Sequence, residues 1–163
     1  MAVTIREREA GDRERLVELF HQLNVHEDNI TGDRRTDRAA AEEALAEIEG
    51  RLAEKGGSFL VAELAGGVAG LLVLVYRIDS VYIREEHRPY ALIRDLVVDD
   101  RQRRRGIGRA LLDAAEKAAV AAGYRRLVLG VLDGNAAAEA AYARQGYRTY
   151  AHDLEKIIAP DES

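Results

Sequence analysis

The chain has 163 residues, of which 47% are apolar and 33% charged, with a formal net charge of −5. These values predict one folded domain over residues 1–163 and argue against a dedicated nucleic-acid binder, which would carry excess positive charge. The absence of cysteine excludes disulfides, thiolate metal sites and a cysteine nucleophile, and no apolar run reaches the roughly 18 residues of a membrane span. The absence of cysteine makes the cytoplasm the expected location. We expect no metal site, because the four histidines are not paired at ligand spacing.

The first half of the chain predicts two helices and three strands. Residues 3–7 alternate as a strand, and Gly11 and Asp12 supply a break and an N-cap for a helix whose apolar face includes Leu16 and Phe20. Periodicity is lost over residues 24–35, which we interpret as a polar loop. The elements expected next are a helix capped by Asp37 and ended by Gly56, strands over residues 59–64 and 68–78 joined by a tight turn, and an irregular charged segment over residues 79–89.

The second half predicts a strand, a helix, a strand and a helix. Residues 92–98 are an apolar run rich in β-branched residues, and an arginine- and glycine-rich loop leads from them into a helix that ends near Gly123. Residues 127–132 predict the next strand, and a helix follows between Asn135 and Gly146. Residues 147–158 alternate loosely and predict one or two final strands. This order predicts an α/β fold with a mixed sheet and helices on both faces.

The loop between the central strand and its helix has the composition of a phosphate site. Free N–H groups at a helix start favour an anion, glycine lets the anion approach the main chain, and arginine binds phosphate with two N–H groups. No Walker A pattern is present, and Leu111 occupies the third glycine position of a dinucleotide fingerprint. The residues of this candidate site are Arg103, Arg104, Arg105, Gly106, Ile107, Gly108 and Arg109.

A second motif follows from Asn135 to Tyr147, with the sequence NAAAEAAYARQGY. Asn135 can cap the helix, and Tyr142 lies two turns later on about the same face. On a purely structural interpretation, Tyr142 only packs its helix on the sheet. Arg103-x-x-Gly106-x-Gly108 resembles motif A of the GNAT family of N-acetyltransferases, and Asn135 to Tyr147 resembles its motif B; both stand in the order and spacing of that family.

The resemblance implies the GNAT fold, a mostly antiparallel mixed sheet splayed between strands 4 and 5, and transfer of an acetyl group from acetyl-CoA directly to a primary amine. It places the pyrophosphate on the loop from Arg103 to Arg109 and the pantetheine arm along the main chain of Leu96, Val97 and Val98. It also implies that Asn135 contacts the pantetheine and that Tyr142 stands beside the sulfur as general acid. Family habit suggests a homodimer.

The general base and the acceptor are less determined. Many relatives have a glutamate on the central strand where this chain has Arg94, and Asp95 would face the other side unless a bulge intervenes. Asp95 acting through water is the first choice of base, with His26, Glu27, Glu85, Glu86 and His87 as alternatives. The acceptor segments of the family correspond to residues 24–35 and 79–90, which suggests His26, Glu27, Tyr82 and Glu85 as substrate contacts. An acidic lining favours a small cationic amine, polyamine- or aminoglycoside-like.

Other functions fit the same motifs. Arg94 in place of a glutamate base suggests a catalytically weak module that binds acetyl-CoA as a sensor. A protein N-terminus or a lysine side chain is an alternative acceptor. We expect no nucleic-acid partner and no membrane contact.

Overall fold

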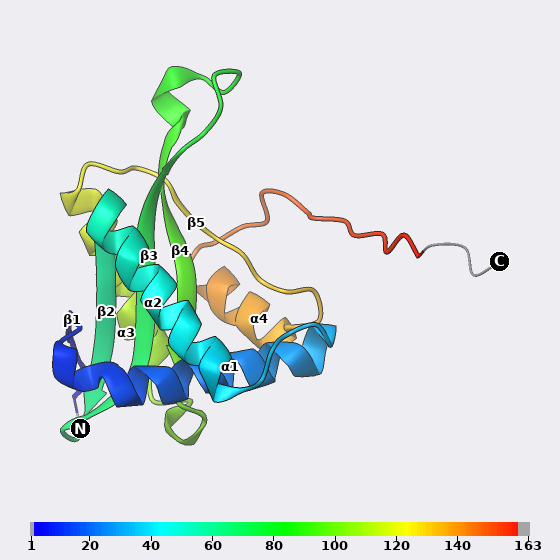
Figure 1. Cartoon of the computed structure of the whole chain (residues 1–163). Helices are drawn as coiled ribbons and strands as arrows, with labels where there is room; N and C mark the ends of the chain where they lie inside the picture. The colour runs from blue at the N-terminus through cyan, green and yellow to red at the C-terminus, as the bar shows by residue number, and fades with distance from the viewer. Residues whose placement is uncertain (1, 160–163) are drawn as a thin grey trace.

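A computed structural model describes residues 2–159, and its centre is a sheet in the strand order β1-β2-β3-β4-β5 (Figure 1). The strands are β1 (Thr4–Glu7), β2 (Gly57–Leu64), β3 (Gly67–Ile78), β4 (Pro89–Val98) and β5 (Leu127–Leu129). β1 to β4 pair antiparallel with their neighbours, and β5 runs parallel to β4. The mixed, mostly antiparallel sheet is as predicted, although β5 is shorter than the expected strand over residues 127–132.

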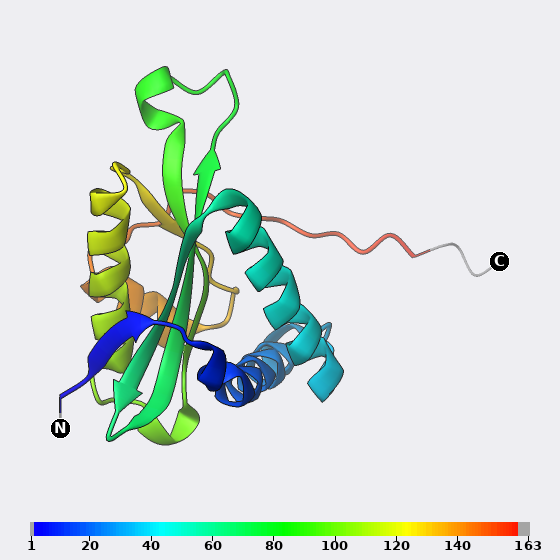
Figure 2. The same cartoon turned by 60° about the vertical axis from the view of Figure 1, so that its left-hand side comes forward.

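Helices cover both faces of this sheet, which confirms the layer arrangement. They are α1 (Arg13–Thr31), α2 (Arg38–Lys55), α3 (Ile107–Ala121) and α4 (Ala136–Arg144), with short 3₁₀ turns η1 (Ala10–Asp12), η2 (Glu85–His87) and η3 (Asp100–Gln102). Figure 2 shows α1 and α2 on one side of the strands and α3 and α4 on the other. No helix among residues 2–159 is long and apolar enough to cross a bilayer.

Two hydrophobic clusters lie on the two faces because side chains alternate along each strand. On β4, Val97 belongs to the cluster that packs α1 and α2 on the sheet, whereas Leu96 and Val98 pack with the α3 cluster. α3 buries Ile107 and Leu111 completely or nearly so. The alternation decides which side of the sheet each functional group of β4 reaches.

The first helix is longer than predicted. The expected polar loop over residues 24–35 is wrong, because α1 continues to Thr31 and only residues 32–37 connect it to α2. Gly32 ends the helix in a left-handed conformation (φ 72°), and its N–H donates to the Asp28 carbonyl at 2.8 Å. Periodicity fades because the last turns hold few apolar residues, while a glycine cap still allows the helix to extend.

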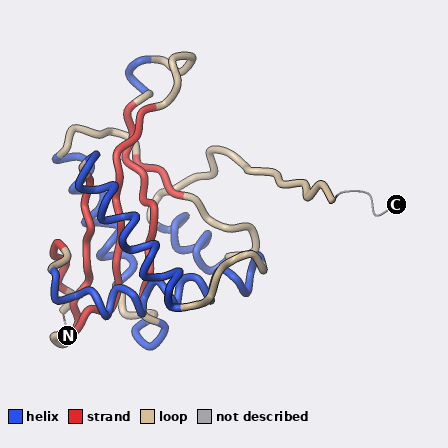
Figure 3. The backbone as a smooth tube through the Cα atoms, viewed as in Figure 1, coloured by secondary structure: helices blue, strands red, loops and turns tan. Residues whose placement is uncertain are grey.

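The predicted final strands are also absent. Within the described part of the chain, residues 147–159 have no strand or helix (Figure 3). Gly146 stops α4 as expected (φ 88°), and residues 148–159 are exposed. An extended segment needs a neighbouring strand to satisfy the hydrogen bonds of its backbone. Alternation of side chains in the sequence is therefore not enough to form a strand here.

Asp99 follows the last residue of β4, where the candidate phosphate loop begins, and its side chain bonds this point to α1. Its side chain is 6% exposed and accepts hydrogen bonds from the Arg15 guanidinium, the Arg101 N–H (3.2 Å) and the Gln22 amide (3.4 Å). Burial alone would raise the pKa of Asp99, but these bonds outweigh it and hold the pKa below its usual range. The ionised carboxylate therefore stabilises the fold.

Replacing this carboxylate should cost stability. We expect Asp99→Ala to lower the free energy of unfolding by about 2–3 kcal/mol, because it leaves Arg15 without its buried partner. Asp100→Ala is the matched control, since the carboxylate of Asp100 is exposed and forms its ion pair with the exposed Arg103 (2.6 Å). Urea unfolding at pH 7 measures both variants. Because the pKa of Asp99 is depressed, this stabilisation is lost as pH falls through the pKa of the folded state. The difference in unfolding free energy between Asp99→Ala and wild type should therefore become smaller at acid pH. A difference that becomes larger at acid pH would contradict this role of Asp99.

Candidate active site

The loop from Arg103 to the start of α3 presents free main-chain N–H groups. The helix begins at Ile107, and its first internal bond runs from the Ala110 N–H to the Gly106 carbonyl at 3.0 Å. The N–H groups of residues 107–109 therefore have no acceptor within the helix. Arg104 and Gly106 both take left-handed conformations (φ 62° and 77°), which curve the backbone into a concave array of amides. This geometry suits an anion such as a phosphate.

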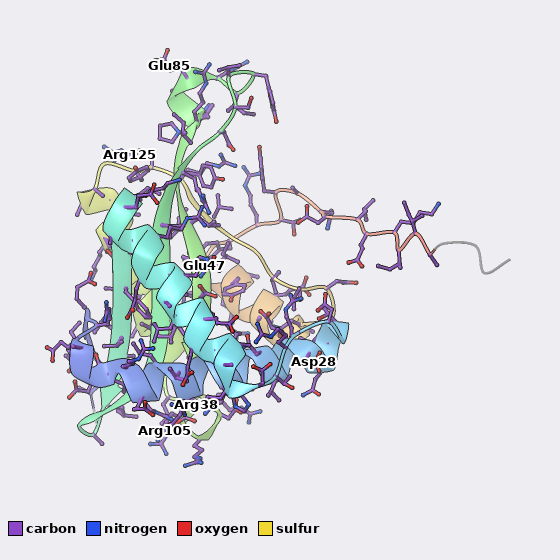
Figure 4. All side chains as sticks on the ribbon, in the orientation of Figure 1. Asp28, Arg38, Glu47, Glu85, Arg105 and Arg125 are labelled. Carbon is purple, nitrogen blue, oxygen red and sulfur yellow. The ribbon has the colours of Figure 1, made fainter. Side chains whose placement is uncertain are left out.

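The arginines around this loop are exposed and add positive charge. Arg103 pairs with Asp100 at 2.6 Å, and Arg109 is 3.9 Å from Asp113, so both are only lightly held. Figure 4 shows Arg105 at the end of the molecule opposite Glu85. Exposed side chains of this kind can turn toward a bound phosphate without breaking core contacts.

Gly108 lies in the first turn of α3, among the residues whose main-chain N–H groups are free of helix bonds. A β-carbon added there would meet only the Val98 side chain, at the ordinary contact distance of 3.7 Å. Gly108→Val should therefore fold, while its added methyl groups crowd the amides of the loop. We expect affinity for CoA to fall at least about tenfold by calorimetry. Ala121→Val, at the exposed far end of α3, should bind as wild type; equal affinity in both variants would refute the loop assignment.

Pairing between β4 and β5 stops part-way along β4. Ala91, Leu92 and Ile93 are opposite Leu127, Val128 and Leu129, and no pairing with β5 continues beyond Ile93. β4 itself runs on to Val98, so its edge over residues 94–98 faces a gap instead of a strand. Main-chain groups along such an edge can bond an extended ligand. The predicted splay between strands 4 and 5 is thus confirmed.

A bulge at Arg94 changes which side chains share a face. The β3 to β4 register passes from Val73 opposite Asp95 to Leu74 opposite Ile93, which leaves Arg94 as the extra residue. As a result, Arg94 and Asp95 lie close enough for a hydrogen bond of 3.2 Å instead of pointing apart. Asp95 stands two residues before Val97, so it faces the side that α1 and α2 cover.

Asp95 belongs to a cluster of acidic groups from three elements. The Arg94 guanidinium bonds Glu47 of α2 at 3.0 Å, and Glu27 of α1 bonds Arg34 at 2.9 Å. Burial raises the pKa of Asp95; Arg94 opposes this rise, whereas the negative charges of Glu27 and Glu47 add to it, and the net direction is upward. A carboxylate with a raised pKa is a stronger base than an exposed aspartate.

α4 contributes two polar side chains beside β5. Asn135 caps the helix as predicted, its Oδ1 accepting the Ala138 N–H at 3.4 Å. Tyr142 is half-buried, packs against the α3-side cluster and meets the Tyr147 ring edge-on at 5.9 Å. Burial raises the pKa of Tyr142, so its hydroxyl keeps its proton at neutral pH. The tyrosine can therefore donate a proton but not accept one there.

The structure separates the predicted substrate residues into two groups. His26 and Glu27 lie on α1, and Glu27 is near enough to influence Asp95. Tyr82 and Glu85 instead lie in the connection that projects beyond the sheet between β3 and β4, and Glu85 is at its tip, away from Glu47 (Figure 4). Tyr82 is 84% exposed. A contact of Tyr82 or Glu85 with the acceptor stays a prediction.

Sequence reasoning missed Glu47. It lies on the exposed side of α2 next to the buried Ile48 and looks like any solvated glutamate until the Arg94 contact at 3.0 Å is seen. The unusual arginine at position 94 was the only signal that a carboxylate partner was needed. Among residues 2–159, no group of three or more histidine, aspartate or glutamate side chains could hold a metal ion.

The arrangement combines four features. The loop over residues 103–109, with its free main-chain N–H groups, is called the cradle below. Beside it are the gap that exposes the edge of β4, a tyrosine on one face of the sheet and a carboxylate on the other. The acetyltransferase (GNAT) family model matches residues 16–147. The chain belongs to the GNAT family. Members of this family use acetyl-CoA as acetyl donor, and the cradle and gap fit a phosphate-bearing, extended cofactor. This GNAT protein is thus an acetyl-CoA-dependent N-acetyltransferase by family.

Solved structures of several proteins, acetyltransferases among them, resemble this GNAT chain. A putative acetyl transferase from Pyrococcus furiosus is 27% identical, with a TM-score of 0.73 over 96% of this chain and 100% of that one. A transcriptional regulator from Bacillus halodurans C-125 is 21% identical, with a TM-score of 0.75 over 96% and 100%. AAC(6')-Iy, bound to the bisubstrate analogue CoA-S-monomethyl-acetylneamine, is 18% identical, with a TM-score of 0.74 over 98% and 100%. A search of curated protein sequences found no significant match.

Proposed function

We propose that this GNAT protein acetylates a primary amine of a small cationic molecule, polyamine-like or aminoglycoside-like, with Asp95 as base and Tyr142 as acid. The observation that carries the proposal is the bulge at Arg94. It brings Asp95 to the face that α1 and α2 cover, within the influence of Glu27 and Glu47. Tyr142 packs on the opposite face, with the α3 cluster. The proposed acid and base thus lie on opposite faces of the sheet.

The cradle and the gap position the donor in this proposal. Acetyl-CoA supplies an activated acetyl thioester. The N–H groups at Ile107, Gly108 and Arg109 would hold the pyrophosphate, with Arg103, Arg104 and Arg105 adding charge around it. The main chain of Leu96, Val97 and Val98 would bond the pantetheine arm along the open edge of β4, and the Asn135 amide nitrogen can donate to the same arm because Oδ1 is used by the cap.

The acidic cluster suits a positively charged acceptor. A lysine-like amine has a pKa of about 10.4 and arrives protonated, so a base must remove a proton before the nitrogen can attack. Asp95 would take that proton through a water molecule. Glu27 and Glu47 would attract the cation and stabilise further ammonium groups beyond the reacting one. Aminoglycosides and polyamines carry several such groups, which is why we favour them over a protein N-terminus.

A sensor role has one observation in its favour. Arg94 already bonds Asp95 at 3.2 Å, so the carboxylate is partly engaged and less free to accept a proton. In that case the protein would bind acetyl-CoA and transfer nothing. Initial rates of thiol release separate the two functions.

The acceptor class is tested by comparing kcat/KM across amines of different charge. The panel contains a polyamine, an aminoglycoside, a monoamine, a lysine peptide and a peptide with a free N-terminus. We expect the polycations to be preferred, and Glu47→Gln to raise KM for them more than for the monoamine. Glu54→Gln, another exposed carboxylate on α2, is the control. A preference for either peptide would overturn the small-molecule acceptor, and binding without release from any amine would favour the sensor.

The neighbours of Asp95 should set the acid limb of the pH profile. Activity falls as pH drops through the pKa of a base that must be ionised. Arg94→Ala removes a positive neighbour and should move this limb of kcat/KM upward by about one pH unit. Glu47→Gln removes a negative neighbour and should move it downward. Arg94→Lys keeps the charge, so its acid limb should stay near that of wild type. If the acid limbs of Arg94→Ala and Glu47→Gln do not move in opposite directions, Asp95 is excluded as the titrating group.

A further inference from the structure

A pocket of about 250 Å³ lies at the end of β4 that is far from the cradle, where the connection between β3 and β4 joins the sheet. Figure 1 shows this connection projecting beyond the sheet and the chain after α4 passing β5. The lining combines two aliphatic side chains with three tyrosines, Tyr82, Tyr90 and Tyr150, and with the pair of Asp79 and Arg126. We call it the tyrosine pocket.

The polar groups of the tyrosine pocket are held in place. Arg126 Nη1 donates to Asp79 Oδ2 at 2.7 Å. The guanidinium carbon lies 5.1 Å from the ring centre of Tyr90 and 4.7 Å from that of Tyr150. Tyr82 and Tyr150 are exposed, so both present ring surface to a ligand. The pocket therefore combines apolar ring faces with a fixed pair of hydrogen-bonding groups whose charges cancel.

The connection that carries Tyr82 is braced by its own hydrogen bonds. The Arg88 guanidinium donates to the main-chain carbonyls of Val81 and Ile83, both at 2.8 Å. The Asp79 N–H donates to the Arg88 carbonyl at 2.9 Å. These bonds hold the backbone on both sides of Tyr82 and leave its side chain available. A surface that is ordered in advance loses little conformational entropy when a ligand binds.

The lining favours a ligand that has both apolar faces and hydroxyl groups. A purely aromatic ring would cover the pair of Asp79 and Arg126 without replacing its bonds to water, which costs free energy. An ammonium group would meet the positive charge of Arg126, and a phosphate would meet Asp79. A sugar ring can pack its C–H groups on tyrosine faces, while its hydroxyls donate to Asp79 and accept from Arg126. The pocket is smaller than the roughly 300 Å³ at which drug-sized sites begin, which suits one such ring.

β4 connects the tyrosine pocket to Asp95. Tyr90 stands two residues before Leu92, which packs against the α1 and α2 cluster, so Tyr90 lies on the face that Asp95 shares. Their partners on β3 are Arg77 and Val73, which are four residues apart. This register places Tyr90 and Asp95 about 13 Å apart along the strand. One molecule lying along this face can present an amine to Asp95 and a ring to the pocket.

We propose that the tyrosine pocket binds an uncharged sugar ring of the acceptor, at the end opposite the amine that is acetylated. This inference rests on the proposed function and selects an aminoglycoside-like acceptor over a polyamine, which has no ring to place there. The acceptor is then an oligosaccharide with its reacting amine on a terminal ring, because a single ring cannot span about 13 Å. The pocket contributes binding and takes no part in proton transfer.

The span is tested with acceptors that differ only in the number of rings. Glucose and maltotriose, each carrying one primary amine on the terminal ring, are compared by initial rates of thiol release. We expect kcat/KM to be about tenfold higher for the longer acceptor, which corresponds to one or two added hydrogen bonds. Tyr82→Ala should reduce this ratio to about one, whereas Val81→Ala, an exposed neighbour outside the pocket, should keep it. Equal kcat/KM values for the two acceptors in wild type would overturn the span.

A sugar without an amine separates this inference from the proposed function. Unmodified maltotriose is titrated without acetyl-CoA and followed by tyrosine fluorescence, since the chain has seven tyrosines and no tryptophan. We expect a saturable change at millimolar sugar in wild type and in Val81→Ala, and none in Tyr82→Ala. No change in wild type, or the same change in Tyr82→Ala, would overturn the sugar site, as would saturation by phenol or spermidine in place of the sugar. If maltotriose binds but no amine is acetylated, the proposed function fails and the sugar site stands.

Discussion

Asp95→Asn should lower kcat about 10³-fold while leaving the affinity for acetyl-CoA nearly unchanged. The amide keeps the shape of the carboxylate but cannot accept a proton from the incoming ammonium, and positioned bases contribute about 10²–10⁴-fold. Asp95 lies on the face of the sheet that α1 and α2 cover, where we propose that the acceptor binds, so its replacement should not disturb the loop at Gly108. Steady-state kinetics with a saturating amine, together with calorimetric titration of the cofactor, measures both effects.

Stability distinguishes this loss from misfolding. Burial raises the pKa of Asp95, which means that ionising it at pH 7 opposes folding; the neutral amide removes this cost. Asp95→Asn should therefore melt at the wild-type temperature or above. Asp113→Asn, an exposed carboxylate on α3, is the control and should keep full activity. A wild-type kcat for Asp95→Asn would transfer the role of base to another group.

Tyr142→Phe should lower kcat about 10²-fold, again with little change in cofactor affinity. The thiolate leaves more readily when a donor meets it, and Tyr142 retains its proton at neutral pH because burial raises its pKa. The phenyl ring keeps the packing against the α3 cluster, so only the hydroxyl is lost. Thiol release at saturating substrates gives kcat, and calorimetry gives the affinity.

Tyr147→Phe is the matched control for this variant. Tyr147 meets Tyr142 edge-on, and burial together with the nearby Glu116 and Tyr142 raises the pKa of Tyr147 to about 12. It is thus a second half-buried tyrosine in the same cluster, and its variant should work near the wild-type rate. Equal losses in the two variants would show that packing, not proton donation, explains the effect of Tyr142.

The parts of the site that depend on local sequence could be predicted. The cradle arises from glycines and a helix start within seven residues, and the Asn135 cap and Gly146 stop are similarly short-range. Alternation along β4 also predicted the sheet, although it could not show the bulge, because an extra residue in a strand is decided by the partner β3. Arg94 and Asp95 share a face only for that reason.

Other features depend on tertiary contacts that one sequence does not show. Glu47 becomes part of the site when α2 crosses β4, and α1 extends to Thr31 through a glycine cap without hydrophobic periodicity. The C-terminal residues alternate like a strand, yet no strand forms there because they leave the sheet. For Glu47, the deciding partner lies far away in the chain.

We propose that the gap between β4 and β5 binds acetyl-CoA, whose acetyl group is transferred to an amine held near the acidic cluster. Calorimetric titration of the wild-type protein with acetyl-CoA, followed in the same sample by thiol release on adding a polyamine, tests it most directly. We expect saturable binding and then release of CoA in step with acetylated amine. Absence of binding at millimolar acetyl-CoA would contradict the assigned cradle and gap, and binding with no release from any amine would contradict the assignment of Asp95 and Tyr142 as base and acid.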